Sequence, residues 1–128
     1  MKLILVIGIT LICACNFSKN RKIEYFENGY VKTLRNCNSD GQFDGLSIWF
    51  YPNGFVEKQI TYKHGQANGN AFYYYDNGAL KGRAFYRSDS LDGFRTDYVN
   101  DSVGIIKSVV FYKMGKLVEV RKRDSNDK

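Results

Sequence analysis

Side chains that could carry out catalysis or hold a metal ion are few and scattered in this chain. His64 is the only histidine, and no Cys or Asp lies around it at zinc-ligand spacing. Its place beside Gly65 fits a surface turn better than a general base. No serine or cysteine nucleophile is arranged with a base, and no glycine loop has phosphate-binding spacing. The sequence therefore predicts a protein that is not an enzyme and has no cofactor.

Two acidic pairs raise the question of a calcium site. Asp40 with Asp44, and Asp89 with Asp92, lie in segments rich in Asn, Asp, Ser and Gly. Neither pair has the ligand number or spacing of a calcium loop. Aspartate favours turns because its carboxylate accepts hydrogen bonds from nearby backbone amides. We therefore expect turn residues here and no metal.

The first cysteines belong to a candidate export signal. Residues 3–12 are apolar apart from Gly8 and Thr10, and such a run is too short to span a bilayer, which takes about twenty residues. Ile12-Cys13-Ala14-Cys15 resembles the lipobox of bacterial lipoproteins, in which the Cys after a small residue is lipidated. The resemblance implies a signal-peptide helix over 1–14 and a lipidated Cys15 followed by a tether over 15–21. It also implies a lipid-anchored place in the bacterial cell envelope, and the alternative is an ordinary secretory signal.

Aromatic and basic residues are the best candidates for a binding surface, since aromatics make up 16% of the chain and the formal net charge is +6. The expected strip comprises Trp49, Tyr51, Tyr73 and Tyr75. Exposed aromatics give large contact area at low entropic cost, so we expect a protein partner. The same strip with Lys58, Lys81 and Arg83 could instead hold an envelope lipid or glycan. Cross-strand stacking that only stabilises a sheet remains the alternative, and no nucleic-acid partner is expected.

A repeat of about 24 residues must position these groups. Gly29, Gly54, Gly78 and Gly104 follow one another at 25, 24 and 26 residues. Gly45, Gly69 and Gly93 keep a step of 24 residues, and Gly65 follows Gly41 at the same step. Independent markers in one period indicate tandem structural units that stack into a continuous array.

Each unit is predicted to be a β-hairpin. Three of the Asn-Gly pairs, at residues 28–29, 53–54 and 77–78, separate runs rich in Tyr, Phe, Val and Ile. This favours hairpin turns in which both residues have positive φ. Longer connections are expected over residues 38–45, 63–69 and 87–93. The fourth turn, near Asp101 and Gly104, lacks the plain Asn-Gly pair, so we expect a longer or bulged hairpin there.

Alignment on the turn glycines predicts which side chains share a face. One column holds Ile23, Ile48, Phe72 and Thr96, followed two residues later on the same face by Tyr25, Phe50, Tyr74 and Tyr98. A mostly small column, made of Thr33, Lys58, Gly82 and Ser108, indicates a close approach of another hairpin. Cys37 stands in a column of tyrosines, so we expect a small buried residue rather than a reactive thiol.

The repeat unit resembles the MORN-repeat variant found in bacterial proteins of the YwqK antitoxin family. The resemblance is carried by Tyr51-Pro52-Asn53-Gly54-Phe55-Val56 with Tyr62-Lys63-His64-Gly65, and by Tyr75-Asp76-Asn77-Gly78 with Leu91-Asp92-Gly93. It implies an all-β, elongated antiparallel β-meander over residues 22–120, without a cofactor, that acts as a protein-binding scaffold. The antitoxin label implies that such a scaffold neutralises its partner. The remaining residues, 121–128, are expected to form a disordered polar tail.

Overall fold

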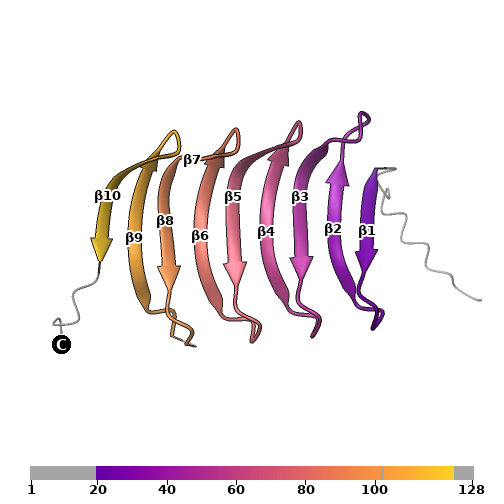
Figure 1. The fold of residues 1–128 in the computed structure, drawn as a ribbon, viewed down its shortest axis with the longest axis horizontal. Coiled ribbons are helices and arrows are strands. Elements are labelled where there is room, and N and C mark those ends of the chain that lie inside the picture. Colours follow the sequence, from indigo (N-terminus) through magenta and orange to yellow (C-terminus); the bar gives the residue numbers. More distant parts are fainter. Residues whose placement is uncertain (1–19, 102, 123–128) are drawn as a thin grey trace, which may run out of the picture.

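The computed structural model describes residues 20–101 and 103–122, and all secondary structure in this part is β-strand. The strands are β1 (Arg21–Tyr25), β2 (Val31–Cys37), β3 (Phe43–Phe50), β4 (Val56–Lys63), β5 (Gln66–Tyr74), β6 (Leu80–Arg87), β7 (Ser90–Leu91), β8 (Gly93–Tyr98), β9 (Ile106–Lys113) and β10 (Lys116–Lys122). They lie side by side in chain order within one antiparallel sheet, except that the short β7 leaves the row and pairs with β6 (Figure 1). The predicted all-β antiparallel meander of hairpins is confirmed.

The strands occupy nearly the expected part of the chain. β1 begins at Arg21 and β10 ends at Lys122, so two residues assigned to the C-terminal tail belong to the last strand. The predicted signal peptide, Cys15 and residues 123–128 lie outside the described residues. Within those that are described, no helix is long and apolar enough to cross a bilayer.

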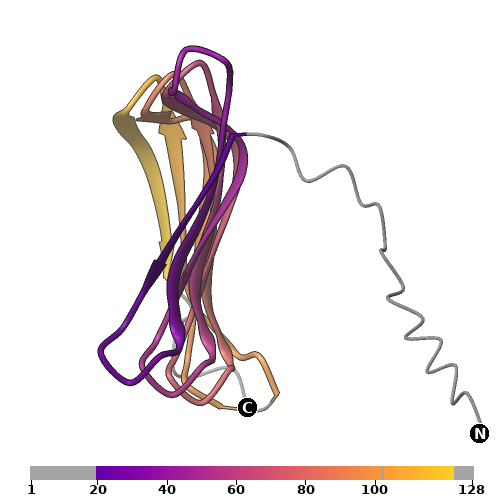
Figure 2. The same ribbon diagram turned by 90° about the vertical axis from the view of Figure 1, so that its right-hand side faces the viewer.

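The sheet is one bent layer. Figure 2 views it edge-on, and the described strands follow a single curve with no second sheet or helix packed on either side. A break in register recurs near the end of the first strand of each hairpin, at Tyr25, Phe50, Tyr74 and Tyr98. Such β-bulges bend and twist a strand, so each repeat contributes its own share of the curvature.

The Asn-Gly pairs at residues 28–29, 53–54 and 77–78 lie at strand reversals, as predicted, but they form a different turn; Asn68-Gly69 lies within β5. In the second hairpin the Gly54 amide donates to the Tyr51 carbonyl at 2.9 Å, and of the turn residues only Gly54 has positive φ, at 91°. Asn53 Oδ1 accepts the Phe55 amide at 3.1 Å. This is a type I turn followed by a left-handed glycine. The predicted turn with positive φ at both residues is wrong here, because Pro52 fixes φ near −65° and the Asn53 side chain closes the type I geometry.

The turn asparagines also join each hairpin to the next. Their side-chain Nδ2 groups donate from Asn28 to the Pro52 carbonyl (3.0 Å), from Asn53 to the Asp76 carbonyl (2.7 Å) and from Asn77 to Asn100 Oδ1 (3.0 Å). Each bond spans 23 or 24 residues, which is one repeat. We call this series (Asn28, Asn53, Asn77) the asparagine ladder. It gives a reason for asparagine at this position that does not depend on φ.

Turns with two positive φ values lie at the opposite end of the sheet. Their central pairs are His64-Gly65 (50° and 82°), Ser88-Asp89 (46° and 67°) and Met114-Gly115 (50° and 78°). These two-residue turns match the right-handed twist of the strands that they join. The predicted longer connections over 63–69 and 87–93 are therefore wrong, since β5 already starts at Gln66 and β7 at Ser90. The first connection does keep a longer loop, closed between Asn38 and Gln42.

The fourth hairpin departs from the others as predicted. The Val99 amide donates to the carbonyl of Ile105, six residues on, whereas the other hairpins close between residues four apart. Asp101 Oδ1 accepts the amides of Val103 (3.1 Å) and Gly104 (2.7 Å). A carboxylate thus organises a turn that is two residues longer.

Alternation of side chains along the strands gives the sheet two unlike faces. The tyrosine face carries Trp49, Lys58, Tyr62, Tyr73 and Tyr86, and the phenylalanine face carries Leu46, Phe72, Arg83, Phe85 and Phe94. The best-buried side chains are small ones on the tyrosine face, where Ser47, between Arg35 and Ile60, and Ala71, between Ile60 and Ala84, are 0% exposed. The apolar column through Ile48 and Phe72 does share one face, but it is the less well packed phenylalanine face.

Candidate binding surfaces

Three of the predicted binding residues meet at the centre of the tyrosine face. Trp49 pairs with Lys58 between β3 and β4, and Lys58 pairs with Tyr73 between β4 and β5. Lys58 Nζ lies 4.8 Å from the centre of the Trp49 ring, within the range of a cation–π contact. All three side chains are half-buried by one another and by their neighbours. The cluster therefore offers aromatic surface together with the Lys58 ammonium group, which already contacts the Trp49 ring.

The Tyr73 hydroxyl is engaged within the sheet. It lies 3.1 Å from the hydroxyl of Tyr86. Burial raises the pKa of Tyr73 well above its usual value, and the hydrogen bond with Tyr86 raises that pKa further. The phenol therefore stays protonated at neutral pH, where it can form hydrogen bonds but cannot serve as a phenolate nucleophile.

Tyr51 and Tyr75 tie one hairpin to the next. Their hydroxyls donate to the carbonyls of Tyr74 (2.8 Å) and Tyr98 (3.0 Å). Lys81 Nζ lies 5.6 Å from the centre of the Tyr75 ring. These side chains lie next to the Asn-Gly turns, and both hydroxyls are used internally, so they contribute ring surface rather than free polar groups.

Arg83 does not join the other predicted residues. It pairs with Phe72 and with Thr96, and so lies on the phenylalanine face. Gly82, not Arg83, occupies the position that Lys58 holds in the preceding repeat, and adjacent strand residues point to opposite sides. A single surface that holds all seven predicted residues is therefore wrong.

The phenylalanine face leaves several large apolar side chains open to solvent. The exposed fraction is 54% for Phe94, 41% for Leu46 and 36% for Phe85. The Phe94 ring packs against Phe111 with ring centres 4.9 Å apart. Phe85 and Phe94 lie on the neighbouring strands β6 and β8 and border one groove, and contiguous exposed apolar surface on a folded protein usually marks an interaction site.

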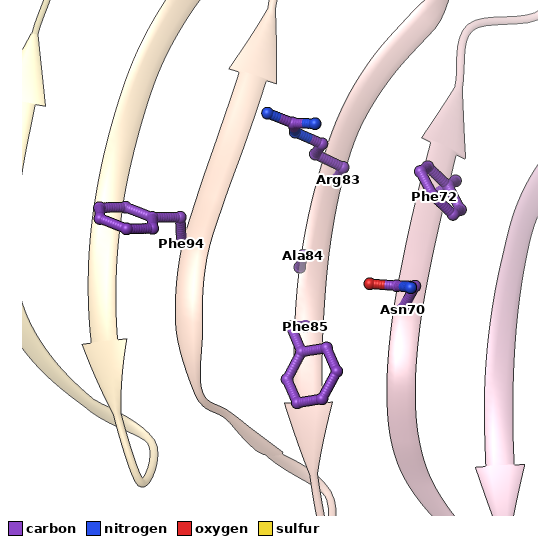
Figure 3. Close-up of a pocket in the computed structure, with 6 residues that line it drawn as sticks. All are labelled: Asn70, Phe72, Arg83, Ala84, Phe85 and Phe94. Atoms are coloured by element: carbon purple, nitrogen blue, oxygen red, sulfur yellow. The ribbon is translucent and has the colours of Figure 1, made fainter.

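A shallow groove crosses this face between β5, β6 and β8 (Figure 3). Asn70 and Phe72 come from β5, Arg83 and Phe85 from β6, and Phe94 from β8. Its volume of about 360 Å³ is at the small end of the range of ligand sites, roughly 300–1,000 Å³. The groove combines three phenyl rings with one cation and one amide.

The phenylalanine face was not identified from the sequence as a binding surface, although a signal for it exists. Leu46, Asn70 and Phe94 each follow one of the second marker glycines, at a step of 24 residues. Ile48 and Phe72 share that face, but the alternation of side chains does not show whether another layer covers it.

His64, Asp40 and Asp89 lie in turns, as predicted, whereas Asp44 lies within β3 and Asp92 lies between β7 and β8, so the turn assignment is wrong for these two. The His64 side chain is 70% exposed, and its Nδ1 lies 3.9 Å from Asp44 Oδ2. Asp89 Oδ1 accepts the Ala67 amide at 2.7 Å, and Asp92 Oδ1 accepts the Met114 amide at 3.2 Å. Within residues 20–101 and 103–122, no group of three or more His, Cys, Asp or Glu side chains could hold a metal ion.

Two small residues have the packing that was predicted for them. Cys37 is a free thiol that is 7% exposed, which fits a buried apolar role. At Gly82 a Cβ atom would lie 3.0 Å from Asp97 Oδ1 and 3.2 Å from the Thr96 carbonyl oxygen. The adjacent strand β8 therefore leaves no room for a side chain at this position.

Comparison with known proteins supports the repeat assignment. The family model of the MORN repeat variant matches residues 43–64 and 67–88. These segments coincide with the β3–β4 hairpin and the β5–β6 hairpin. No curated protein and no solved structure gives a significant match. MORN repeats are often protein- or membrane-binding motifs, and their all-β repeat fold is a binding type rather than a known enzyme family.

Proposed function

We propose that this chain is a lipid-anchored envelope protein whose hairpin array binds a protein partner on an uncovered face of the sheet. The observation that carries the proposal is the open phenylalanine face, where Phe94, Leu46 and Phe85 remain exposed in a single-layered sheet. Burying exposed apolar surface contributes about 25 cal/mol per Å². A partner that covers this face gains that free energy without first unfolding any part of the sheet.

Site-specific photo-crosslinking in cells tests the proposal. A benzophenone amino acid placed at Phe94 samples the phenylalanine face, one at Tyr73 samples the tyrosine face, and one at Lys113 near a turn serves as the control. The proposal expects one protein to be crosslinked from a single face. Equal crosslinking from all three positions, or none from either face, would contradict it.

The proposed anchor has a separate test. Replacing Cys15 with Ser removes the thiol that the lipobox resemblance marks for lipidation. We expect the wild-type chain to incorporate a radiolabelled fatty acid and to sediment with membranes, and the Cys15→Ser variant to do neither. Equal labelling of both forms would eliminate Cys15 as the anchor.

A toxin-neutralising role is a narrower form of the same proposal. It is supported by the resemblance of the repeat unit to the YwqK antitoxin family and by nothing else in the chain. A toxin encoded next to this protein should be harmless when both are produced in the envelope. Undiminished toxicity would leave the scaffold without this role.

A second candidate function is recognition of an envelope lipid or glycan by the tyrosine face. The observation that favours it is the Trp49–Lys58–Tyr73 cluster, which pairs stacking surface with a cation. Replacing Trp49 and Tyr73 with Ala should then reduce binding to liposomes or glycans. If those variants fold and lose only the crosslinked protein, the partner lies on this face and is not a lipid or glycan.

A further inference from the structure

We propose that the groove on the phenylalanine face holds an acidic segment of a protein partner, with a carboxylate on Arg83 and an apolar side chain between Phe85 and Phe94. The inference deepens the proposed function and rests on it, because it names the chemistry of the protein that the face binds. It commits to a protein segment rather than a membrane.

The first argument is the unmatched charge of Arg83. In the described part of the chain its guanidinium has neither a hydrogen bond nor an ion pair, although it is exposed at the groove. By contrast, Arg35, Arg87, Arg95 and Arg121 each pair with a carboxylate.

The second argument is that, among the residues that the structure describes, no acidic side chain lies next to Arg83. Its direct neighbours across the strands are Phe72 and Thr96, and the remaining groove residues are neutral. The nearest carboxylate along β8 is Asp97, which pairs with Gly82 on the tyrosine face. No carboxylate of the described residues neutralises Arg83, so its guanidinium is available to the carboxylate of a partner.

The third argument concerns the apolar side chains around the Arg83 guanidinium. A guanidinium offers a rigid fork of donors that matches a carboxylate. Phe72, Phe85 and Phe94 border the groove, so a docked segment would displace water from around the ion pair. Electrostatic attraction strengthens as water is excluded, and the exposed rings supply apolar contact area beside it.

A membrane surface fits this groove less well. Binding to anionic lipid generally needs several basic residues, each contributing about 1 kcal/mol near the surface. Arg83 is the one cation that lines the groove, and Asn70 adds an amide that can recognise peptide groups. The hollow shape also suits an inserted side chain better than a flat layer of headgroups.

Nuclear magnetic resonance titration of the repeat-bearing chain with short peptides tests the inference. The probe is an N-acetylated, C-amidated pentapeptide Asp-Phe-Asp-Leu-Asp, and the comparison peptides carry Asn or Lys in place of each Asp. We expect the acidic peptide to shift resonances of β5, β6 and β8 and to bind about three- to tenfold more tightly than the Asn peptide. The Lys peptide should bind more weakly still.

Variants of the protein test whether Arg83 supplies the positive charge that binds the acidic peptide. Arg83→Gln should reduce the affinity for the acidic peptide to that for the Asn peptide, while Arg83→Lys should restore part of the difference. Lys22→Gln makes the same change of charge on β1, where Lys22 pairs with Arg35 on the tyrosine face, and should leave the affinity unchanged. Phe94→Ser should weaken all three peptides together, and its dispersed spectrum would show that the sheet remains folded.

Three outcomes would overturn the inference. In the first, the acidic peptide shifts no resonances of β5, β6 and β8. In the second, the Lys peptide binds as tightly as the acidic peptide. In the third, the Arg83→Gln variant binds the acidic peptide as tightly as the wild type does. If Arg83→Gln instead lowers co-sedimentation with phosphatidylglycerol vesicles while no peptide binds, the cation serves a membrane and the inference is wrong. Crosslinking from Phe94 to a protein in any of these cases would leave the proposed function standing.

Discussion

The asparagine ladder makes a quantitative prediction about how the repeats are held together. Asn53 uses both ends of its side chain, since Oδ1 accepts the Phe55 amide within its own turn and Nδ2 donates to the Asp76 carbonyl of the next hairpin. The side chain is exposed, so each bond should contribute at the lower to middle part of the usual range of about 0.5–1.5 kcal/mol. Two substitutions separate the two bonds.

Asn53→Ala removes both bonds and should lower the free energy of unfolding by about 1–2 kcal/mol. Asn53→Asp keeps the acceptor for the Phe55 amide but removes the donor and places a negative oxygen against the Asp76 carbonyl, which the native Nδ2 approaches to 2.7 Å. That change alone should cost about 0.5–1.5 kcal/mol at neutral pH. For a domain of roughly 100 residues, 1 kcal/mol lowers the midpoint of thermal unfolding by about 4–8 °C.

Urea unfolding at pH 7 measures these differences, with an unchanged slope showing that the same surface is exposed in each variant. Gln66→Ala, on the exposed surface at the other end of the sheet, is the control and should be neutral. Below about pH 4 the introduced carboxyl becomes protonated and can donate again, so the deficit of Asn53→Asp should shrink. An Asn53→Asp variant as stable as the wild type at pH 7 would refute the reasoning, because the bond between hairpins would then contribute nothing.

Four further predictions follow from contacts in the sheet. Gly82→Ala should destabilise the fold by about 1–3 kcal/mol in urea unfolding, because its Cβ would approach Asp97 Oδ1 to 3.0 Å and a backbone oxygen to 3.2 Å; a neutral result would mean that β8 can move away. Met114→Asn should raise the midpoint of thermal unfolding, since Met114 has φ 50° and asparagine tolerates this region better; a lower midpoint would count against the assigned turn. The Met114 amide, followed by the Arg87 guanidinium, lowers the pKa of Asp92, so the ionised Asp92 carboxylate stabilises the fold above the unfolded pKa near 4, and this stability is lost as pH falls through the folded pKa. Asp92→Asn should therefore flatten the acid side of the profile of unfolding free energy against pH, and an unchanged profile would exclude this residue. Burial and Tyr86 raise the pKa of Tyr73, so stability from this phenol is full below pH 10 and declines above it; Tyr73→Phe should remove the latest step of the ultraviolet titration of the phenols, and persistence of that step would assign it to another tyrosine.

The period of the sequence was enough to predict the strand order. Glycines at steps near 24 residues marked both ends of each hairpin, because a reversal of the chain needs specific backbone conformations. The same markers could not assign the turn types. Asn-Gly suits a type I′ turn in isolation, but Pro52 and the side-chain hydrogen bond of Asn53 favour type I in the second hairpin. The turn with positive φ at both central residues is found instead at His64-Gly65.

The binding surfaces were harder to predict, because alternation alone does not say which face is covered. Antiparallel sheets commonly pack one face on a core, so the column of Ile48 and Phe72 does not by itself indicate an open surface. In this single layer the best-buried side chains, Ser47 and Ala71, lie instead on the tyrosine face. Arg83 was then grouped with residues of the wrong face. The inter-repeat bonds of Asn53 and Tyr51 were also missed, since partners one repeat away become visible only when the hairpins are placed side by side.

Solvent paramagnetic relaxation, measured on the purified repeat-bearing chain with labelled Phe rings and Ala methyl groups, tests the single-layered sheet most directly. An inert soluble paramagnet should strongly relax the rings of Phe94 and Phe85, which are 54% and 36% exposed, and barely affect the methyl groups of Ala71 and Ala84, which are 0% and 5% exposed. Rings of Phe94 and Phe85 as well shielded as the Ala71 methyl group would show that another layer covers this face, and the open binding surface would not exist.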